Sequence, residues 1–260
     1  MTDPIDIKRL HEENRTRWNV ASRAYQEEIE SSGMWRKLPA NPSLFFYPEE
    51  LEISGDLKGK SAAVLGSGDN HAAFALAGMG ATVTSVDISE KQLAAAERRA
   101  KEIGLKISFI QADVTDLGIL KSGVYDLVYT GGHLDVWVAD LDRFYAEAVR
   151  ILKPGGLFVV MEYHPIRRIF NDVAPLEVSR PYFNRGPYQY DAQPEFPNDT
   201  DRPTPQHEFT WTIGDRVTAM LAKGLRIIAL KEMSDEREAW EPVDLSGLPR
   251  RILIVGKKEA

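Results

Sequence analysis

The sequence contains no cysteine among its 260 residues. Without a thiol there can be no disulfide framework, no cysteine nucleophile and no thiolate ligand for a metal. Histidine, aspartate and glutamate do not cluster at metal-ligand spacing either, and the scattered carboxylates of Asp135 and Asp140 do not predict a magnesium site. We therefore expect chemistry based on oxygen, nitrogen and an organic cofactor, with no bound metal.

Long apolar runs and basic clusters are also missing. No stretch approaches the roughly 18 apolar residues that a membrane-spanning helix needs, and the first residues do not resemble a secretion signal. The net charge is -7, and no run of Lys or Arg could follow a phosphate backbone. These absences predict a cytoplasmic protein that binds neither membranes nor nucleic acid. We expect a monomer or homodimer, which the sequence does not distinguish.

The residues that are present suffice for a full-sized core, since 43% of them are hydrophobic. From Ser61 onward, short β-rich runs alternate with helical segments, a pattern typical of parallel βαβ units. The expected strands are 61–65, 82–86, 107–110, 125–129, 157–162, 225–232 and 251–255. The expected helices are 70–79, 90–103, 141–152 and 215–222. The pattern predicts an α/β domain at residues 61–260.

Two segments do not follow this alternation. Residues 1–60 contain an amphipathic helix at 6–30 and then several prolines and aromatic residues, which predicts an N-terminal helical cap. Residues 164–208 hold eight of the 15 prolines, so long regular elements are excluded there. Because this segment is rich in aromatic residues and disordered segments are poor in them, we expect an inserted substrate lid.

A glycine bend follows the first expected strand. The sequence Gly66-Ser67-Gly68 lets the backbone pass close to a ligand, and the helix that follows offers unpaired N–H groups at its start. The second strand ends in Asp87, 19 residues after Gly68, where a carboxylate can accept both hydroxyl protons of a ribose. Together these residues indicate a cofactor that contains a nucleoside.

The bend departs from the dinucleotide fingerprint, because His71 stands where the third glycine would allow close packing beneath a pyrophosphate. The chain also lacks a Tyr-x-x-x-Lys pair. An NAD(P)-dependent oxidoreductase stays an alternative, as does a non-catalytic protein that only binds the cofactor. A third acidic residue, Asp113, follows the strand at 107–110, where it could meet the exocyclic amine of an adenine.

With these residues the sequence resembles the class I S-adenosylmethionine-dependent methyltransferases, from about residue 61 to the C-terminus. The matching motifs are Val64-Leu65-Gly66-Ser67-Gly68, Val86-Asp87-Ile88-Ser89, Gln111-Ala112-Asp113-Val114, Tyr125-Asp126-Leu127-Val128-Tyr129 and Leu152-Lys153-Pro154-Gly155-Gly156. The resemblance implies a three-layer Rossmann-like α/β fold whose seven-stranded sheet is mostly parallel, with one antiparallel strand. It also implies S-adenosylmethionine as the cofactor.

The resemblance assigns a role to each matching residue. Gly66, Ser67 and Gly68 would hold the methionine moiety, and Asp87 the ribose hydroxyls. Ile88 would cover one adenine face, Asp113 would bind the adenine amine beside Val114, and Thr130 would lie near the sulfonium. Family members commonly carry an acidic residue at Val64 and a glycine at Asn70, so we expect Tyr25 of the cap to supply contacts to the methionine end.

The turn after the fourth strand bears on the methyl acceptor. It reads Thr130-Gly131-Gly132-His133 and lacks the Asn/Asp-Pro-Pro-aromatic motif by which methyltransferases of nucleic-acid bases resemble one another. The resemblance therefore implies transfer to an O or N atom of a small, aromatic or heteroaromatic metabolite, in secondary metabolism. His133 and His164 follow strands four and five at the ligand-binding edge, and either could remove a proton or simply orient the acceptor.

Aromatic side chains could form the walls of the acceptor site, because they offer a large contact area at low entropy cost. The candidates are Trp35, Tyr47, Tyr163, Tyr182 and Trp211.

Overall fold

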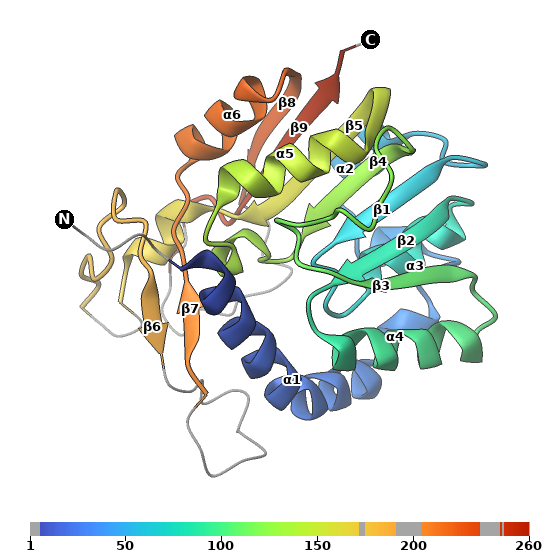
Figure 1. Cartoon of the computed structure of the whole chain (residues 1–260), viewed down its shortest axis with the longest axis horizontal. Helices are drawn as coiled ribbons and strands as arrows, with labels where there is room; N and C mark the ends of the chain where they lie inside the picture. Colours follow the sequence, from blue (N-terminus) through green and yellow to red (C-terminus); the bar gives the residue numbers. More distant parts are fainter. Residues whose placement is uncertain (1–5, 172–174, 191–203, 235–244, 246, 260) are drawn as a thin grey trace.

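The computed structural model describes residues 6–171, 175–190, 204–234, 245 and 247–259. These residues form one seven-stranded sheet with helices on both faces, and a separate two-stranded sheet (Figure 1). The helices are α1 (Ile7–Ser32), α2 (Pro48–Ser54), α3 (His71–Gly78), α4 (Glu90–Glu102), α5 (Leu141–Ile151) and α6 (Ile213–Ala222), with short 3-10 helices η1 (Met34–Arg36), η2 (Pro42–Leu44), η3 (Asp135–Trp137) and η4 (Pro165–Ile169). The strands are β1 (Ser61–Leu65), β2 (Thr82–Asp87), β3 (Ile107–Gln111), β4 (Tyr125–Gly131), β5 (Leu152–Tyr163), β6 (Tyr188–Tyr190), β7 (Gln206–Glu208), β8 (Leu225–Met233) and β9 (Arg251–Lys258).

The strand order of the large sheet is β3-β2-β1-β4-β5-β9-β8. Strands β1 to β5 pair in parallel, and β9 runs antiparallel to both of its neighbours. In the register, Leu65 lies beside Val86, and Asp87 beside Gln111. The carboxyl ends of β1, β2 and β3 therefore meet at one edge, and the predicted fold class, including its single antiparallel strand, is confirmed.

Helices cover both faces of the sheet, so both sets of alternating side chains on its central strands are buried. On β1, Ala63 and Leu65 pack with the core residues of α5 and α6. Ala62 and Val64 pack on the other face with α3 and with Trp35. These continuous apolar strands are what a parallel sheet covered on both sides requires, and they explain why the alternation of strands and helices was readable in the sequence.

The expected elements match the observed ones within a few residues, with one larger difference at β5. We expected a strand at 157–162, whereas β5 begins at Leu152, directly after α5. Leu152 pairs with Tyr125, and the register with β4 then shifts before Leu127. The Pro154-Gly155-Gly156 sequence, expected as a turn, thus lies inside an irregular strand, where Gly155 adopts a positive φ of 78°.

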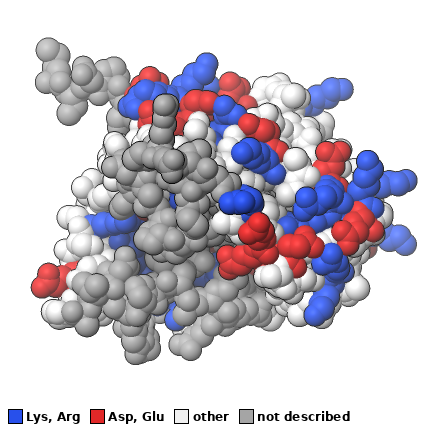
Figure 2. Space-filling model, turned by 90° about the horizontal axis from the view of Figure 1, so that it is seen from below, with Lys and Arg blue, Asp and Glu red and all other residues white. Residues whose placement is uncertain are grey.

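Helix α1 lies across one end of the sheet, between β7 and α4 (Figure 1). It begins at an N-cap, Asp6, whose side chain accepts a hydrogen bond from the backbone N–H of Arg9, and it ends at Gly33. Its exposed face forms ion pairs with α4, such as Arg15 with Glu90 at 2.9 Å. In the described part of the face drawn in Figure 2, acidic and basic side chains are intermixed. No helix in the described ranges has the length and apolarity to span a bilayer.

The predicted cap and lid are described only in part. Residues 6–60 contain α1, η1, η2 and α2, and the division of the chain at residue 60 stays a prediction. In the segment 164–208, η4, β6 and β7 are described, while 172–174 and 191–203 lie outside the described residues. Strand β7 is buried and contacts α1.

Candidate active site

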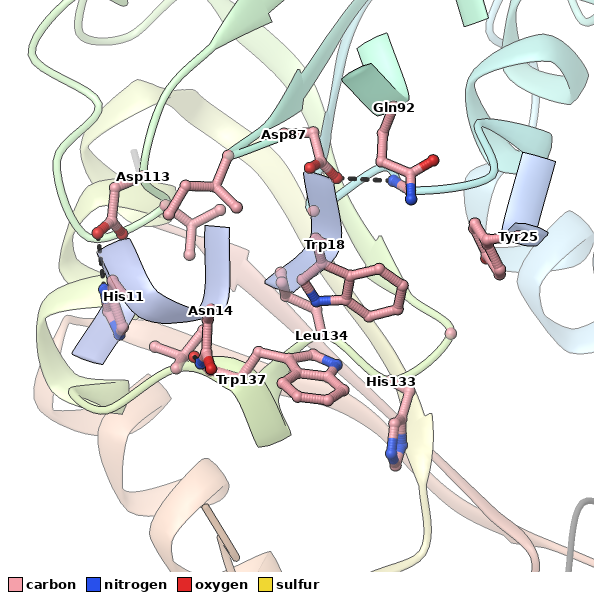
Figure 3. A pocket seen from close by; sticks show the side chains of 16 residues that line it. His11, Asn14, Trp18, Tyr25, Asp87, Gln92, Asp113, His133, Leu134 and Trp137 are labelled. Carbon is pink, nitrogen blue, oxygen red and sulfur yellow. Dashed lines mark hydrogen bonds and ion pairs between the residues drawn. The ribbon is translucent and has the colours of Figure 1, made fainter. Parts of the chain in front are cut away.

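A pocket opens at the edge of the sheet where β1, β2, β3 and β4 end (Figure 3). Its empty volume is about 720 Å³, including the open mouth. The residues that line it are His11, Asn14, Trp18, Tyr25, Gly66, Gly68, Asp87, Ile88, Gln92, Asp113, Val114, Gly132, His133, Leu134, Trp137 and Val138. Eight of the predicted site residues therefore share one pocket: Tyr25, Gly66, Gly68, Asp87, Ile88, Asp113, Val114 and His133.

The glycine bend after β1 requires backbone conformations that favour glycine. Gly66 and Gly68 have positive φ angles of 62° and 38°. A Cβ atom on Gly66 would lie 2.3 Å from the Leu134 side chain, so the bend and the loop after β4 approach as closely as glycine permits. Asn70 has a φ of 63° at the start of α3, a conformation that asparagine tolerates. Asparagine thus replaces the family's third glycine at a position with positive φ.

Asp87 connects the ends of β1 and β2. Its carboxylate accepts hydrogen bonds from the backbone N–H of Gly68 and of Ser89, both at 2.8 Å. Burial raises the pKa of Asp87 above its ordinary value, although hydrogen bonds from the backbone N–H groups of Ser89, Gly68 and Ile88 oppose the rise. The two backbone N–H groups fix the orientation of the carboxylate, and each oxygen keeps a lone pair for a ligand hydroxyl.

Asp113 occupies the corresponding position after β3. One oxygen accepts hydrogen bonds from the backbone N–H and the hydroxyl of Thr115, both at 2.8 Å. The other accepts from Nδ1 of His11 on α1 at 2.6 Å. Burial opposes ionisation of Asp113, but the hydrogen bonds from His11 and Thr115 hold its pKa below the ordinary value. A charged acceptor therefore lies at the end of the pocket opposite the glycine bend.

Aromatic rings from α1 and η3 form a further wall of the pocket. The ring centroid of Trp18 lies 5.6 Å from that of Tyr25 and 5.3 Å from that of Trp137, both in edge-to-face geometry. Figure 3 shows the two indole rings side by side. We did not predict His11, Asn14, Gln92 or Trp137 as site residues. For α1 a signal exists, because His11, Asn14 and Trp18 follow the i, i+3, i+7 spacing of one helix face.

His133 lines the pocket with a positive φ of 86°. Its Nε2 lies 2.9 Å from Nη1 of Arg168, and a guanidinium can only donate, so Nε2 accepts. Burial, followed by the charges of Arg168, Arg251, Arg216 and Arg180, lowers the pKa of His133 well below its ordinary value. The ring is therefore neutral near pH 7, and Arg168 already occupies the lone pair that a general base would use.

Three of the residues predicted as catalytic or cofactor-binding lie outside the pocket lining. Nδ1 of His164 accepts from the Ile166 N–H at 3.2 Å, so Nε2 donates to Glu232 of β8 at 2.7 Å and the ring is directed toward β8. The Ser67 hydroxyl lies 2.8 Å from that of Ser85 on β2, beneath the bend. Thr130 is fully buried within β4, and Gly132 lines the pocket in its place.

The predicted aromatic walls of the acceptor site need correction. Trp35 is fully buried and packs against Phe74 of α3, while Tyr47 belongs to the same core cluster, and neither lines the pocket. Trp211 supports the pocket from behind, because its indole N–H donates to the carbonyls of Asp135 and Val138, both at 3.1 Å.

The two other predicted aromatic residues do not line the pocket either. Tyr163 packs against His133 with ring centroids 4.6 Å apart. Tyr182 packs against Phe183, and its hydroxyl accepts from the Ile213 N–H at 3.4 Å. Their contact with an acceptor stays a prediction.

A buried polar cluster supports the loop after β4. Glu162 of β5 accepts hydrogen bonds from the backbone N–H of Leu134 at 2.9 Å and of Asp135 at 3.3 Å. Asp135 in turn pairs with Arg216 of α6 at 2.6 Å, and both are almost completely buried. Burial, together with the charge of Asp135, raises the pKa of Glu162 to about 8. Glu162 is therefore protonated at neutral pH.

The raised pKa of Glu162 predicts a pH-dependent stability. Between the ordinary value of 4.5 and about 8, the folded protein retains a proton that the unfolded chain releases. Its stabilising effect is present at low pH and is lost as the pH rises through about 8. We expect Glu162→Gln, which mimics the protonated form, to unfold with a flatter pH profile, recovering on the order of 2–4 kcal/mol at alkaline pH.

Urea denaturation of both proteins at acidic, neutral and alkaline pH measures this difference. Glu102→Gln, at an exposed glutamate of α4, is the matched control and should reproduce the wild-type profile. Parallel profiles for the wild type and Glu162→Gln would show that Glu162 does not titrate as described.

The residues of the pocket fit an adenosyl sulfonium. Two carboxylates, the buried Asp87 and the half-buried Asp113, face the pocket from neighbouring strand ends, and Ile88 and Val114 provide apolar surface beside them. The glycine bend leaves room at the end of β1, where a Cβ on Gly68 would meet only the Tyr25 hydroxyl, at 3.9 Å. Within the described ranges, no group of three or more metal-ligating side chains could hold a metal ion.

Comparison with known proteins agrees with this geometry. Residues 64–160 match the family model of a methyltransferase domain. The chain is 31% identical over 154 residues to a ubiquinone biosynthesis O-methyltransferase of Vibrio parahaemolyticus, and 29% identical over 142 residues to the Bordetella avium enzyme of that name. These matches cover 59% and 54% of this chain and span only 60% and 58% of the two relatives.

Solved structures share the fold. A methyltransferase from Mesorhizobium loti, described as S-adenosylmethionine-dependent, has a TM-score of 0.61 at 21% identity, covering 81% of this chain and 96% of its own. A protein from Methanosarcina mazei with the same description has a TM-score of 0.60 at 18% identity, covering 82% and 98%. The matched domain, the sheet order and the pocket at its strand ends together support a class I S-adenosylmethionine-dependent methyltransferase.

Proposed function

We propose that this protein transfers a methyl group from S-adenosylmethionine to an oxygen atom of a small aromatic molecule. The observation that carries the proposal is the meeting of the Gly66–Gly68 bend, Asp87 and Asp113 around one pocket. A dinucleotide is disfavoured because His71, at the third position of the fingerprint, is buried and paired with Asp69 at 2.9 Å.

Different residues of the chain bind different parts of the cofactor. Asp87 holds the ribose hydroxyls, Asp113 the adenine amine, and the glycine bend with Tyr25 the methionine end. The bound cofactor supplies an activated methyl group on its sulfonium. The protein then needs chiefly to align the acceptor with that methyl group and to exclude water, and alignment by itself supplies a large share of the acceleration.

The acceptor is proposed from the walls of the pocket and from the relatives. The indole rings of Trp18 and Trp137 offer broad apolar faces that suit a planar molecule. The names of the relatives in Vibrio and Bordetella support oxygen as the methylated atom. His133 orients the acceptor rather than deprotonating it, because its Nε2 already accepts a hydrogen bond from Arg168.

Two measurements test the proposal. Isothermal titration should detect binding of both S-adenosylmethionine and S-adenosylhomocysteine, and a screen of phenolic and catecholic acceptors should release S-adenosylhomocysteine. Absence of binding by both ligands at millimolar concentration would overturn the proposal. Binding without turnover of any acceptor would favour a non-catalytic protein, and a change of NADH fluorescence on mixing would favour an oxidoreductase.

A further inference from the structure

His11 of α1 connects three parts of the pocket through its imidazole ring. Nδ1 donates to Asp113 at the end of β3, at 2.6 Å, and Nε2 accepts from the backbone N–H of Ala139 at 2.8 Å. Ala139 follows η3 and Val138, which form the wall next to Trp18. The ring itself is buried. Figure 3 shows His11 and Asp113 joined at one end of the pocket.

The two contacts define the protonation of the ring. A backbone N–H can only donate, so Nε2 must carry the lone pair, and the single ring proton of neutral histidine lies on Nδ1. His11 is thus a donor to Asp113, and the carboxylate remains an ionised acceptor. A donor on one lone pair of Oδ2 leaves the other lone pair available to a ligand N–H.

The same helix face carries a second connection, one turn further along α1. The Asn14 side-chain amide donates to the carbonyl of His207 at 2.9 Å and accepts from its N–H at 2.7 Å. It also donates to the carbonyl of Trp137 at 3.2 Å. Asn14 therefore holds α1 against β7 and η3 without touching Asp113, whereas His11 touches both the wall and the carboxylate.

We propose that His11 is a cofactor-positioning residue that holds the Asp113 carboxylate in the orientation that recognises the exocyclic amine of adenine. The inference rests on the proposed function, since it assumes that adenine binds at Asp113. Without His11, Asp113 keeps only its contacts to Thr115, and Oδ2 is free to turn or to take up water. The preference for a ligand that carries the exocyclic amine then falls more than the affinity for ligands with or without it.

The test compares two ligands that differ only at the amine: S-adenosylhomocysteine and its inosine analogue, in which a carbonyl replaces the amine. We expect the wild type to favour the adenosine ligand by roughly 10- to 100-fold in isothermal titration, because the carbonyl would face an ionised carboxylate. His11→Ala should reduce this preference to a few-fold. Asn14→Ala should weaken the binding of both ligands to the same degree and leave the preference for the adenosine ligand unchanged.

Two conservative variants separate the functions of the ring nitrogens. The amide of asparagine occupies roughly the place of Nδ1, so His11→Asn can still donate to Asp113 and should retain the preference. The amide of glutamine occupies roughly the place of Nε2, so His11→Gln can meet Ala139 and should lose the preference. Thermal unfolding of each variant shows whether it is folded.

A measurement on the ligand-free protein tests the hydrogen bonds of the His11 ring without any assumption about the ligand. In ¹H–¹⁵N spectra of histidine-labelled protein, the His11 signals, identified by their loss in His11→Asn, should show a protonated Nδ1 and an unprotonated Nε2. A proton on Nε2, or equal preference ratios in the wild type and His11→Ala, would overturn the inference. Failure of the wild type to bind S-adenosylhomocysteine would instead overturn the proposed function.

Discussion

Asp87→Asn is expected to weaken the binding of S-adenosylhomocysteine by at least about 100-fold, because charge-assisted hydrogen bonds to two ribose hydroxyls would be lost. The loop would be disturbed as well. The wild-type carboxylate accepts from the backbone N–H of both Gly68 and Ser89, and an amide has only one acceptor oxygen. One of the two N–H groups would then face an NH₂ group. Isothermal titration of the folded variant measures the loss.

Asp69→Asn is the matched control for this variant. Asp69 lies in the same bend and loses the same charge, but its carboxylate pairs with His71 and does not line the pocket. We expect the affinity of Asp69→Asn for S-adenosylhomocysteine to stay within a few-fold of that of the wild type. If Asp87→Asn bound S-adenosylhomocysteine as well as Asp69→Asn does, the ribose would have to be held elsewhere.

The second large effect is expected in stability. Arg216→Met should lower the free energy of unfolding by about 3–5 kcal/mol, because it leaves the Asp135 carboxylate buried without its partner. The exposed fractions of the two side chains are 3% and 1%, so water cannot replace the lost contact. Although burial opposes it, the Asp135 carboxylate raises the pKa of Arg216, which keeps the guanidinium charged. Urea denaturation measures the change.

Two further variants test this interpretation. Asp135→Asn combined with Arg216→Met removes both charges, and we expect it to recover a large part of the stability lost in Arg216→Met. Arg226→Met breaks an arginine–glutamate pair whose side chains are 59% and 62% exposed, and it should change stability by less than about 1 kcal/mol. If Arg216→Met lowered the free energy of unfolding by less than about 1 kcal/mol as well, the buried pair would contribute little to stability.

Much of the cofactor half of the site was predictable from the sequence. Glycine at the bend, an aspartate at the end of β2 and another after β3 are local signals, each a few residues from the strand it follows. Parallel strands bring their carboxyl ends to one edge whatever the detailed packing, so residues at those ends meet in space. This is why Gly66, Asp87 and Asp113 could be grouped before the structure was known.

The acceptor half was not predictable in the same way. Trp18 lies within the N-terminal helix α1 and Trp35 follows it closely, yet Trp18 forms part of the pocket wall and Trp35 lies in the core. Trp18 faces the pocket because of the rotation of α1 against the sheet, which depends on contacts with β7 and α4, whereas Trp35 lies on η1 beyond the end of α1 and packs against α3. Composition shows only that aromatic residues are available.

The sequence by itself determined the α/β alternation, the strand ends that carry the proposed cofactor residues and the absence of thiol chemistry, because these follow from residue types and short spacings. Tertiary structure alone decided that His11 meets Asp113, 102 residues away, that Arg168 occupies the lone pair of His133, and that Glu162 keeps its proton. Hydrogen bonds and burial between distant segments exist only once the chain has packed, and in this protein they determine which ionisable groups face the pocket and in which protonation state.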